Sequence, residues 1–211
     1  MATCDEPIAK ETQRFGGKFV MTRDTHQRAS DRVAEAMEKI EKETNEKIDI
    51  VVMIQGDEPL VFPQMIDEAV GPVVDQDGVK VTNLMAPLKT QEEQEDPNEI
   101  KVVTDKDHFA LYFSRNPIPM VRDNTTTPFR YKQVCIIAFE RDFLLHYTQM
   151  KETPLEIAES VDMLRIIEEG ERVKMVLTDF ETYSVDTEED LKRVEAVMAR
   201  DALFQEYSQR I

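Results

Sequence analysis

The sequence contains no tryptophan, few glycines, two cysteines and no long uncharged apolar segment. Its apolar runs are far shorter than the roughly 20 residues that cross a bilayer, and its N-terminus lacks the basic-then-apolar layout of a signal peptide. We therefore expect a cytoplasmic protein without a membrane partner. Because only Cys4 and Cys135 are present, a disulfide framework and a zinc site are both disfavoured.

Positive charge is also scarce. The formal net charge is −17, which argues against an extended nucleic-acid surface because phosphate backbones are held chiefly by Lys and Arg. A small anionic substrate is still possible if a metal ion bridges it to the protein. A chain of 211 residues with 41% hydrophobic residues can bury a core, and we expect one domain over residues 1–211.

Strand-like and helix-like segments alternate along the chain. Apolar β-branched runs predict strands, and spacing of three and four residues predicts helices. Such alternation favours an α/β fold with a mainly parallel, mixed sheet covered by helices, in which the strand near 131–139 is antiparallel. Strands are predicted at 18–22, 48–54, 79–87, 100–103, 109–115 and 131–139, and helices at 29–44, 63–74 and 187–207.

The run at 48–54 leads directly into Gln55-Gly56-Asp57-Glu58-Pro59. Open α/β sheets bind ligands beyond the carboxyl ends of such strands, so the carboxylate of Asp57 is placed where a metal or phosphate would lie. Asp186 also lies at the end of a strand-like segment, directly before the helix predicted at 187–207. Asp186 could be the N-cap of that helix with Glu189 three residues on, or it could share a divalent cation with Asp57. Two carboxylates without Cys or His suit magnesium better than zinc.

Five segments in sequence order resemble the 3-deoxy-manno-octulosonate (Kdo) cytidylyltransferases, or CMP-Kdo synthetases. Sialic acid cytidylyltransferases match the same segments less well. The resemblance covers nearly the whole chain. The segments are Gln55-Gly56-Asp57-Glu58-Pro59, Asp96-Pro97-Asn98-Glu99-Ile100-Lys101-Val102-Val103, Ala110-Leu111-Tyr112-Phe113-Ser114-Arg115 with Ile118-Pro119, Thr153-Pro154-Leu155-Glu156, and Val185-Asp186-Thr187 with Glu189-Asp190-Leu191.

The resemblance implies a nucleotidyltransferase that joins CTP and a 2-keto sugar acid into a CMP-sugar, with release of pyrophosphate, for lipopolysaccharide or surface glycan synthesis. It implies that Asp57 and Asp186 hold Mg²⁺ and that Gln55 faces the acceptor sugar. Arg115 would be available to an anionic group of a substrate. The alternative for Arg115 is an ordinary surface ion pair.

The resemblance also assigns the cytidine side of the site and an oligomeric state. The segment 26–32 matches the family's cytidine-side segment, in which His26 and Arg32 agree in type. The resemblance further implies a homodimer, with much of the contact formed by residues 113–134. The Pro- and Thr-rich stretch at 116–128 within that range is longer than a hairpin turn needs and is a candidate interaction arm.

The chain departs from the family pattern at two places. The first strand of the family and its CTP-binding loop have no counterpart, so we expect an N-terminally truncated form whose sheet has an open edge. A catalytically silent, binding or oligomerising domain is the alternative to an active enzyme. On the sugar side, Gln133 stands at a usual His, Ile137 at a Tyr, and Asp162-Met163 at a Glu-Gln pair. The acceptor is therefore expected to be Kdo or a related 2-keto acid.

Overall fold

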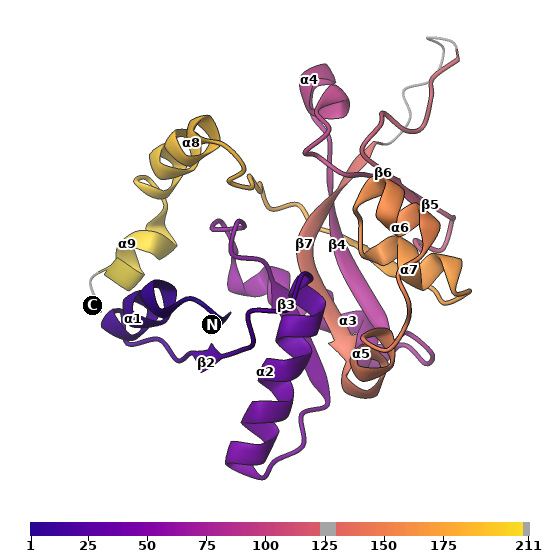
Figure 1. The fold of residues 1–211 in the computed structure, drawn as a ribbon. Helices are drawn as coiled ribbons and strands as arrows, with labels where there is room; N and C mark the ends of the chain where they lie inside the picture. Colours follow the sequence, from indigo (N-terminus) through magenta and orange to yellow (C-terminus); the bar gives the residue numbers. More distant parts are fainter. Residues whose placement is uncertain (123–129, 209–211) are drawn as a thin grey trace.

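In the part of the chain that the structure describes, residues 1–122 and 130–208, strands form a six-stranded sheet with helices on both faces (Figure 1). The structure is a computed structural model. Its strands are β1 (Ala2–Thr3), β2 (Val20–Met21), β3 (Ile50–Ile54), β4 (Val81–Pro87), β5 (Lys101–Thr104), β6 (Ala110–Ser114), β7 (Tyr131–Glu140) and β8 (Lys174–Leu177). Its helices are α1 (Glu6–Arg14), α2 (Ala29–Thr44), α3 (Pro63–Asp75), α4 (Gln91–Glu95), α5 (Arg141–Tyr147), α6 (Pro154–Glu159), α7 (Met163–Glu168), α8 (Glu188–Met198) and α9 (Ala202–Ser208).

The long strand β7 organises the sheet, whose order is β6-β5-β7-β4-β8 with β3 also paired to β7. β3, β4 and β5 are each antiparallel to β7, and β8 is parallel to β4, so these four strands share one direction. The expected α/β fold with a mixed sheet and an antiparallel strand near 131–139 is confirmed. However, most hydrogen-bonded neighbours are antiparallel rather than parallel, because β7 lies between the strands that share a direction.

Alternation along β7 gives the sheet its two apolar faces. Val134, Ile136 and Ala138 pack toward α3, where Met65 and Ala69 are fully buried. The intervening residues, Ile137 and Phe139 among them, belong to the larger core on the opposite face, which includes residues of α2, α5 and α7. Each large aliphatic side chain buried in this way contributes roughly 1.5–3 kcal/mol. The sheet is therefore held rigid from both sides at the strand that carries the site.

Helix α2 and strand β3 follow the sequence prediction closely. α2 covers the predicted range, and Asn45 ends it in a left-handed conformation (φ 56°) with its N–H donating to Glu41 O at 2.8 Å. β3 pairs with β7 on one edge, and on its other edge no strand of the described residues pairs with it. β1 and β2 instead pair with each other in a separate small sheet. The predicted open sheet edge is therefore present at β3.

The C-terminal segment differs from the prediction of one helix over residues 187–207. It forms α8 and α9, because the chain turns after Met198 and Asp201 caps the second helix by accepting from Phe204 N–H at 2.7 Å. None of the described helices is long and apolar enough to cross a membrane. Residues 123–129 of the predicted dimer segment 113–134 lie outside the described residues.

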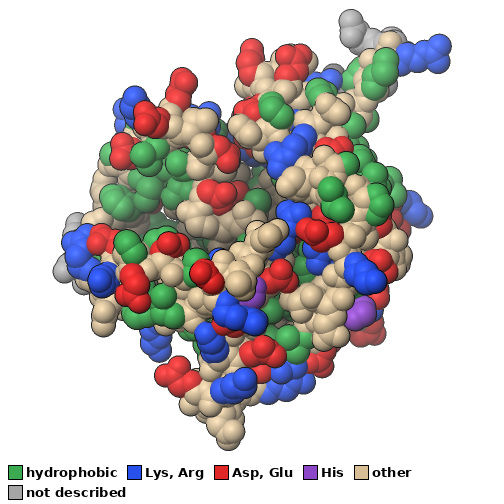
Figure 2. All heavy atoms as spheres, viewed as in Figure 1, with side chains coloured by type: hydrophobic (Ala, Val, Ile, Leu, Met, Phe, Trp, Pro, Cys, Tyr) green, Lys and Arg blue, Asp and Glu red, His purple; other side chains and the backbone are tan. Residues whose placement is uncertain are grey.

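Charged side chains are mixed over the surface drawn in Figure 2. Asp and Glu are interspersed with Lys and Arg on this face rather than separated from them. This distribution gives no continuous basic surface in the view and agrees with the net charge of −17.

Candidate active site

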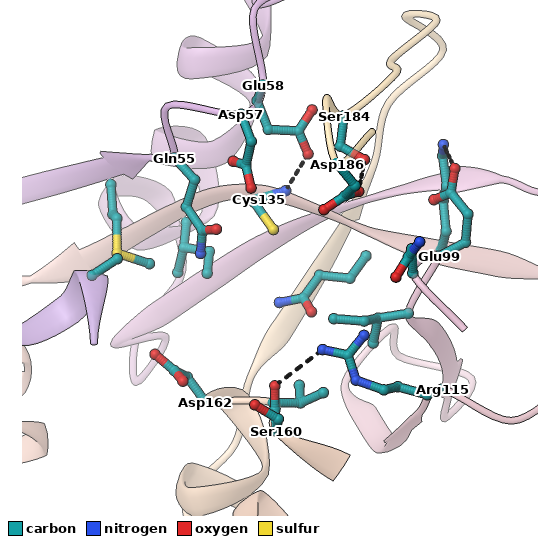
Figure 3. A pocket seen from close by; sticks show the side chains of 18 of the residues that line it. Gln55, Asp57, Glu58, Glu99, Arg115, Cys135, Ser160, Asp162, Ser184 and Asp186 are labelled. Carbon is teal, nitrogen blue, oxygen red and sulfur yellow. Dashed lines mark hydrogen bonds and ion pairs between the residues drawn. The ribbon is translucent and has the colours of Figure 1, made fainter. Parts of the chain in front are cut away.

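A pocket of about 390 Å³ opens where β3 and β5 approach the same edge of β7 (Figure 3). β3 covers one half of this edge and β5 covers the other, so the middle of β7 is left open to the pocket. Six of the eight residues predicted for the site line it, and two do not. The six are Gln55, Asp57, Arg115, Gln133, Asp162 and Asp186; the two are His26 and Arg32.

A β-bulge in β7 shapes the pocket floor. The register against β4 shifts between Asn83 and Leu84, which leaves Cys135 and Ile136 as extra residues on β7. The buried side chain of Asn83 stabilises this bulge by donating to Val134 O at 2.7 Å, and Gln133 donates to Asn83 Oδ1 at 2.6 Å. Bulges re-aim side chains next to active sites, and here the bulge presents Cys135 and Gln133 to the pocket.

Asp57 and Asp186 come from loops that the backbone ties together. Val185 N–H donates to Asp57 O at 2.9 Å, so the two carboxylates line the same part of the pocket (Figure 3). Asp57 Oδ1 is buried and has no hydrogen-bond partner among the described residues. Ser184 Oγ donates to Asp186 Oδ2 at 3.0 Å. A buried carboxylate oxygen without a donor is costly, and a cation would satisfy it.

Asp186 is not the N-cap of α8, so that interpretation was wrong. Thr187 is the cap: its hydroxyl accepts from Asp190 N–H at 3.2 Å, and Asp190 Oδ2 accepts from Thr187 N–H at 3.0 Å. The capping box lies one residue later than predicted. Thr187 and Asp190 are three residues apart, as are the predicted partners Asp186 and Glu189, so the spacing alone fits both pairs. The carboxylate of Asp186 therefore has no role in starting the helix and is available to the pocket.

Glu58 is a site residue that the sequence reasoning did not single out. Its side chain is 8% exposed, and its Oε1 accepts from Cys135 N–H at 3.2 Å. Burial raises the pKa of Glu58 to about 7, and the neighbouring charge of Asp57 acts in the same direction. Burial also raises the pKa of the Cys135 thiol, and the negative charge of Glu58 raises it further. The position next to Asp57 in the segment 55–59 was the signal that could have identified Glu58.

The opposite end of the pocket carries its own ion pairs. Arg28 Nη1 lies 3.1 Å from Asp162 Oδ1, and burial raises the pKa of Asp162 while Arg28 opposes that rise. Beneath them, Arg165 forms two hydrogen bonds to the fully buried Glu156, at 2.7 and 2.6 Å. Asp162 is a position at which the chain departs from the family pattern, and the structure brings it into contact with Arg28.

Two further cations line the pocket. Arg115 is held by backbone carbonyls: its Nε donates to Glu159 O and its Nη1 to Pro97 O, each at 2.8 Å. The guanidinium of Arg115 bonds to backbone oxygens and forms no salt bridge with a described residue, so the alternative of an ordinary surface ion pair is not observed. Lys132 is buried and pairs with Glu99 at 2.8 Å, and it was missed because a single Lys in a strand gives no distinctive pattern.

His26 and Arg32 lie beside the pocket and bond to other parts of the chain. His26 Nε2 contacts the carboxylate of Glu35, and Arg32 donates to Thr22 Oγ1 at 2.6 Å. Between these two residues, Gln27, Arg28 and Ala29 line the pocket. The middle of the segment 26–32 therefore reaches the site, while its two ends do not. Nucleotide binding by His26 and Arg32 stays a prediction.

Residues 1–173 match the model of the cytidylyltransferase family. The chain belongs to this family. It is 40% identical over 210 residues to the 3-deoxy-manno-octulosonate cytidylyltransferase of Geobacter metallireducens, a match that covers 95% of this chain and 80% of the relative. It is 42% identical over 194 residues to the enzyme of the same name from Solibacter usitatus, covering 92% and 75%. The family predicted from the sequence motifs is confirmed.

Solved structures agree with this membership. The fold matches a CMP:2-keto-3-deoxy-manno-octonic acid synthetase complexed with CTP at a TM-score of 0.82 and 34% identity, over 93% of this chain and 78% of that chain. A glucose-1-phosphate thymidylyltransferase from Bacillus anthracis, described as putative, matches at a TM-score of 0.59 and 15% identity, which shows the shared fold alone. The nucleotidyltransferase-like architecture expected from the resemblance is thus confirmed.

The two carboxylates of Asp57 and Asp186 fit a metal ion that has further coordination positions open to other ligands. Enzymes of the family are generally metal-dependent. The described residues contain no cluster of three or more His, Cys, Asp or Glu arranged to hold a metal. Asp57 and Asp186 alone therefore suit a hard cation that takes its other ligands from substrate phosphates and water.

Proposed function

We propose that this cytidylyltransferase transfers the CMP group of CTP to a 2-keto sugar acid, Kdo or a related acid, with release of pyrophosphate. The observation that carries the proposal is the buried, unpartnered Oδ1 of Asp57 beside Asp186 in the pocket. The names of the relatives, which act on 3-deoxy-manno-octulosonate, support the acceptor class. The product would serve lipopolysaccharide or other surface glycan synthesis in the cytoplasm.

Asp57 and Asp186 would hold Mg²⁺, with substrate phosphates completing its coordination. When bound, Mg²⁺ supplies positive charge that stabilises the phosphate oxygens as the α-phosphorus is attacked. In the reaction the anomeric oxygen of the acceptor forms a bond to the α-phosphorus, the bond from that phosphorus to pyrophosphate breaks, and the proton of the anomeric hydroxyl passes to water. Gln55, on the same loop as Asp57, would contact the acceptor next to its reacting oxygen.

The acceptor would lie between Gln55 and the far end of the pocket. Arg115 is fixed by backbone carbonyls with a guanidinium suited to the acceptor's carboxylate. Gln133 and Asp162 would bind hydroxyl groups. Ile137 also lines the pocket and offers no hydrogen bond, so the acceptor is a 2-keto acid that needs no partner there. A panel of such acids assayed with CTP would test this: turnover of Kdo alone would exclude a modified acceptor.

A catalytically silent domain is the second candidate. The buried Oδ1 of Asp57, which has no partner among the described residues, favours the enzyme, because a silent scaffold has no physical reason to bury an unpaired carboxylate oxygen. The two candidates differ in whether CTP and Mg²⁺ bind at all.

The test is a pyrophosphate-release assay with CTP, Kdo and Mg²⁺, on the wild type and two variants. We expect Asp186→Asn to lower the rate at least 100-fold, since the carboxylate that shares the metal is lost. Glu189→Gln removes the same charge three residues away, outside the pocket, and should leave the rate unchanged. Excess chelator should abolish the activity and added Mg²⁺ should restore it. An equal rate for Asp186→Asn and wild type would exclude this metal site.

We also propose that residues 1–211 act as one domain that pairs as a homodimer through residues 113–134. Gel filtration with light scattering at micromolar concentration tests this part. A monomer would exclude the dimer without affecting the proposed reaction.

A further inference from the structure

Asn83 is a fully buried polar residue of β4 that does not itself line the catalytic pocket. It lies where the register of β4 against β7 shifts, directly behind the bulge that forms the pocket floor. A buried amide is costly unless its hydrogen bonds are made. The partners of Asn83 therefore show what its side chain does for the pocket.

The hydrogen bonds of Asn83 fix the way its side-chain amide is turned. Its Nδ2 donates to Val134 O at 2.7 Å, to Leu84 O at 3.0 Å and to Ile136 O at 3.5 Å. Backbone carbonyl oxygens only accept, so the amide nitrogen has to face them, and the reversed amide would place an oxygen against three oxygens. The Oδ1 of Asn83 is therefore left to face Gln133.

Gln133 takes its orientation from Asn83. Its Nε2 donates to Asn83 Oδ1 at 2.6 Å, and because an amide oxygen cannot donate, Gln133 has to present its nitrogen to this partner. Its backbone N–H donates to Ile100 O at 2.8 Å, which holds the residue in place. The side chain lines the pocket, and its Oε1 forms no hydrogen bond with a described residue. The atom of Gln133 left wholly without a partner is thus a carbonyl oxygen.

The surroundings of Gln133 favour a ligand group that donates a hydrogen bond. More carboxylates than cations line the pocket, so its potential favours a group that turns hydrogen toward the wall. Asp162, which Figure 3 shows across the pocket from Asp57 and Asp186, is a carboxylate and accepts as well. Ile137 neither donates nor accepts. This part of the wall therefore matches a hydrogen-bond donor better than an acceptor.

We propose that Asn83 is a positioning residue, which turns the amide of Gln133 so that Oε1 accepts a hydrogen bond from a hydroxyl or ammonium group of the sugar acid. The inference rests on the proposed function, because the sugar acid is the ligand, and it adds the chemistry that Gln133 selects. A sugar acid that carries an acceptor without hydrogen at this point would face an oxygen with an oxygen or fluorine. Such a mismatch leaves both groups unpaired and weakens binding.

The first measurement requires no catalysis. Hydrogen exchange of the side-chain amides is followed by NMR in the whole chain, with the exposed Gln13 as the reference. We expect the bonded Nε2 hydrogen of Gln133 to exchange roughly tenfold more slowly than those of Gln13, and Asn83→Ala to remove this difference. Equal exchange at the two glutamines of the wild type would overturn the proposal, whether or not the protein transfers CMP.

The second measurement is a double-variant cycle of Asn83→Ala and Gln133→Ala. Each single variant should raise KM for Kdo roughly 3- to 10-fold, the range for loss of one neutral hydrogen bond, with kcat and KM for CTP little changed. Because Asn83 acts through Gln133, the double variant should be no worse than Gln133→Ala alone. Effects that multiply would show that Asn83 only supports the strand, and would overturn the proposal. A wild type that turns over no sugar acid would instead refute the proposed function.

The matched control is Thr82→Val. Thr82 is the neighbouring buried polar residue of β4, and its hydroxyl donates to Ala69 O of α3, on the other face of the sheet. This variant loses a buried hydrogen bond of the same strand without touching Gln133, so its melting temperature should fall while KM for Kdo stays that of the wild type. A rise in KM equal to that of Asn83→Ala would mean a general loosening of β4 and would overturn the proposal.

The direction of the hydrogen bond is tested with derivatives of Kdo in which one hydroxyl at a time is replaced by hydrogen, fluorine or an amino group. This test uses only the wild type and Gln133→Ala, so it holds even if Asn83→Ala does not fold. An ammonium group can only donate, whereas fluorine has no hydrogen to donate.

At one position we expect the wild type to accept the amino derivative as well as Kdo. The deoxy and fluoro derivatives should both raise KM there, roughly 3- to 10-fold, and Gln133→Ala should abolish these differences. If that position tolerates fluorine and rejects the amine, Gln133 presents its nitrogen and the proposal is wrong. It is equally wrong if Gln133→Ala changes the preference at no position.

Discussion

The two ends of the catalytic pocket hold similar carboxylates in opposite electrostatic settings. At one end Asp57, Glu58 and Asp186 form no ion pair with any described residue. At the other end Asp162 and Glu156 are neutralised by Arg28 and Arg165. The first end is where we propose that a cation binds from solution, whereas the second has its cations built into the fold. Removing a carboxylate charge at the first end should therefore not lower the free energy of unfolding, whereas removing an arginine at the second end should lower it.

The largest expected effect is on catalysis at the unneutralised end. Asp57→Asn should lower the rate of CMP transfer by roughly 10²–10³-fold, a magnitude typical for loss of one group that stabilises transition-state charge. The free energy of unfolding, measured in chelator, should not fall, because the variant removes charge from a carboxylate whose buried Oδ1 has no partner among the described residues. Parallel rate assays and urea titrations provide both numbers. A large loss of stability would contradict the contrast between the two ends.

The neutralised end should respond in the opposite way. Arg165→Met leaves the carboxylate of Glu156 buried without its cation, which should lower the free energy of unfolding by about 3–5 kcal/mol. Glu156→Leu in the same chain should recover most of this loss, because it removes the uncompensated charge. Urea denaturation of the single and double variants measures the difference. A single variant as stable as wild type would show that this pair does not support the pocket.

Glu58 provides a pH test of the unneutralised end. Its pKa is raised from 4.5 to about 7, so between these values the folded protein binds a proton that the unfolded chain has released. Stability must then fall as pH rises through this window, by about 3 kcal/mol in total for a single such group. Glu58→Gln should remove this slope. Unfolding curves at pH 4.5, 6 and 7.5 in chelator test it, and identical slopes in both proteins would refute the assignment.

The smallest effect is expected for Arg28→Ser. The substitution removes one cation from Asp162, whose pKa should rise further because Arg28 opposes the effect of burial. Since Arg28 is partly exposed, we expect a loss of about 1 kcal/mol in stability. A few-fold rise in KM for the acceptor should accompany it. KM values for CTP and acceptor, measured separately, would show which substrate this end of the pocket contacts.

The sequence predicted the elements that depend on local pattern. α2 and β3 were located within two residues because their apolar spacing is regular, and Asp57 was found because it follows β3 directly. The sequence could not show the ion pair of Arg28 with Asp162 or the burial of Glu58, which depend on contacts between distant segments. It also misplaced the cap of α8 by one residue, since aspartate and threonine are both common N-cap residues and stand next to each other here.

The cap of α8 has a consequence for how this enzyme can change. Thr187 starts the helix, and the neighbouring Asp186 faces the pocket, so adjacent residues carry separate tasks. With Asp186 as the proposed metal ligand, we expect mutations at 186 to alter metal preference while the helix that follows keeps its beginning. Laboratory selection for a different cation could therefore explore that position freely without the penalty of melting a neighbouring element.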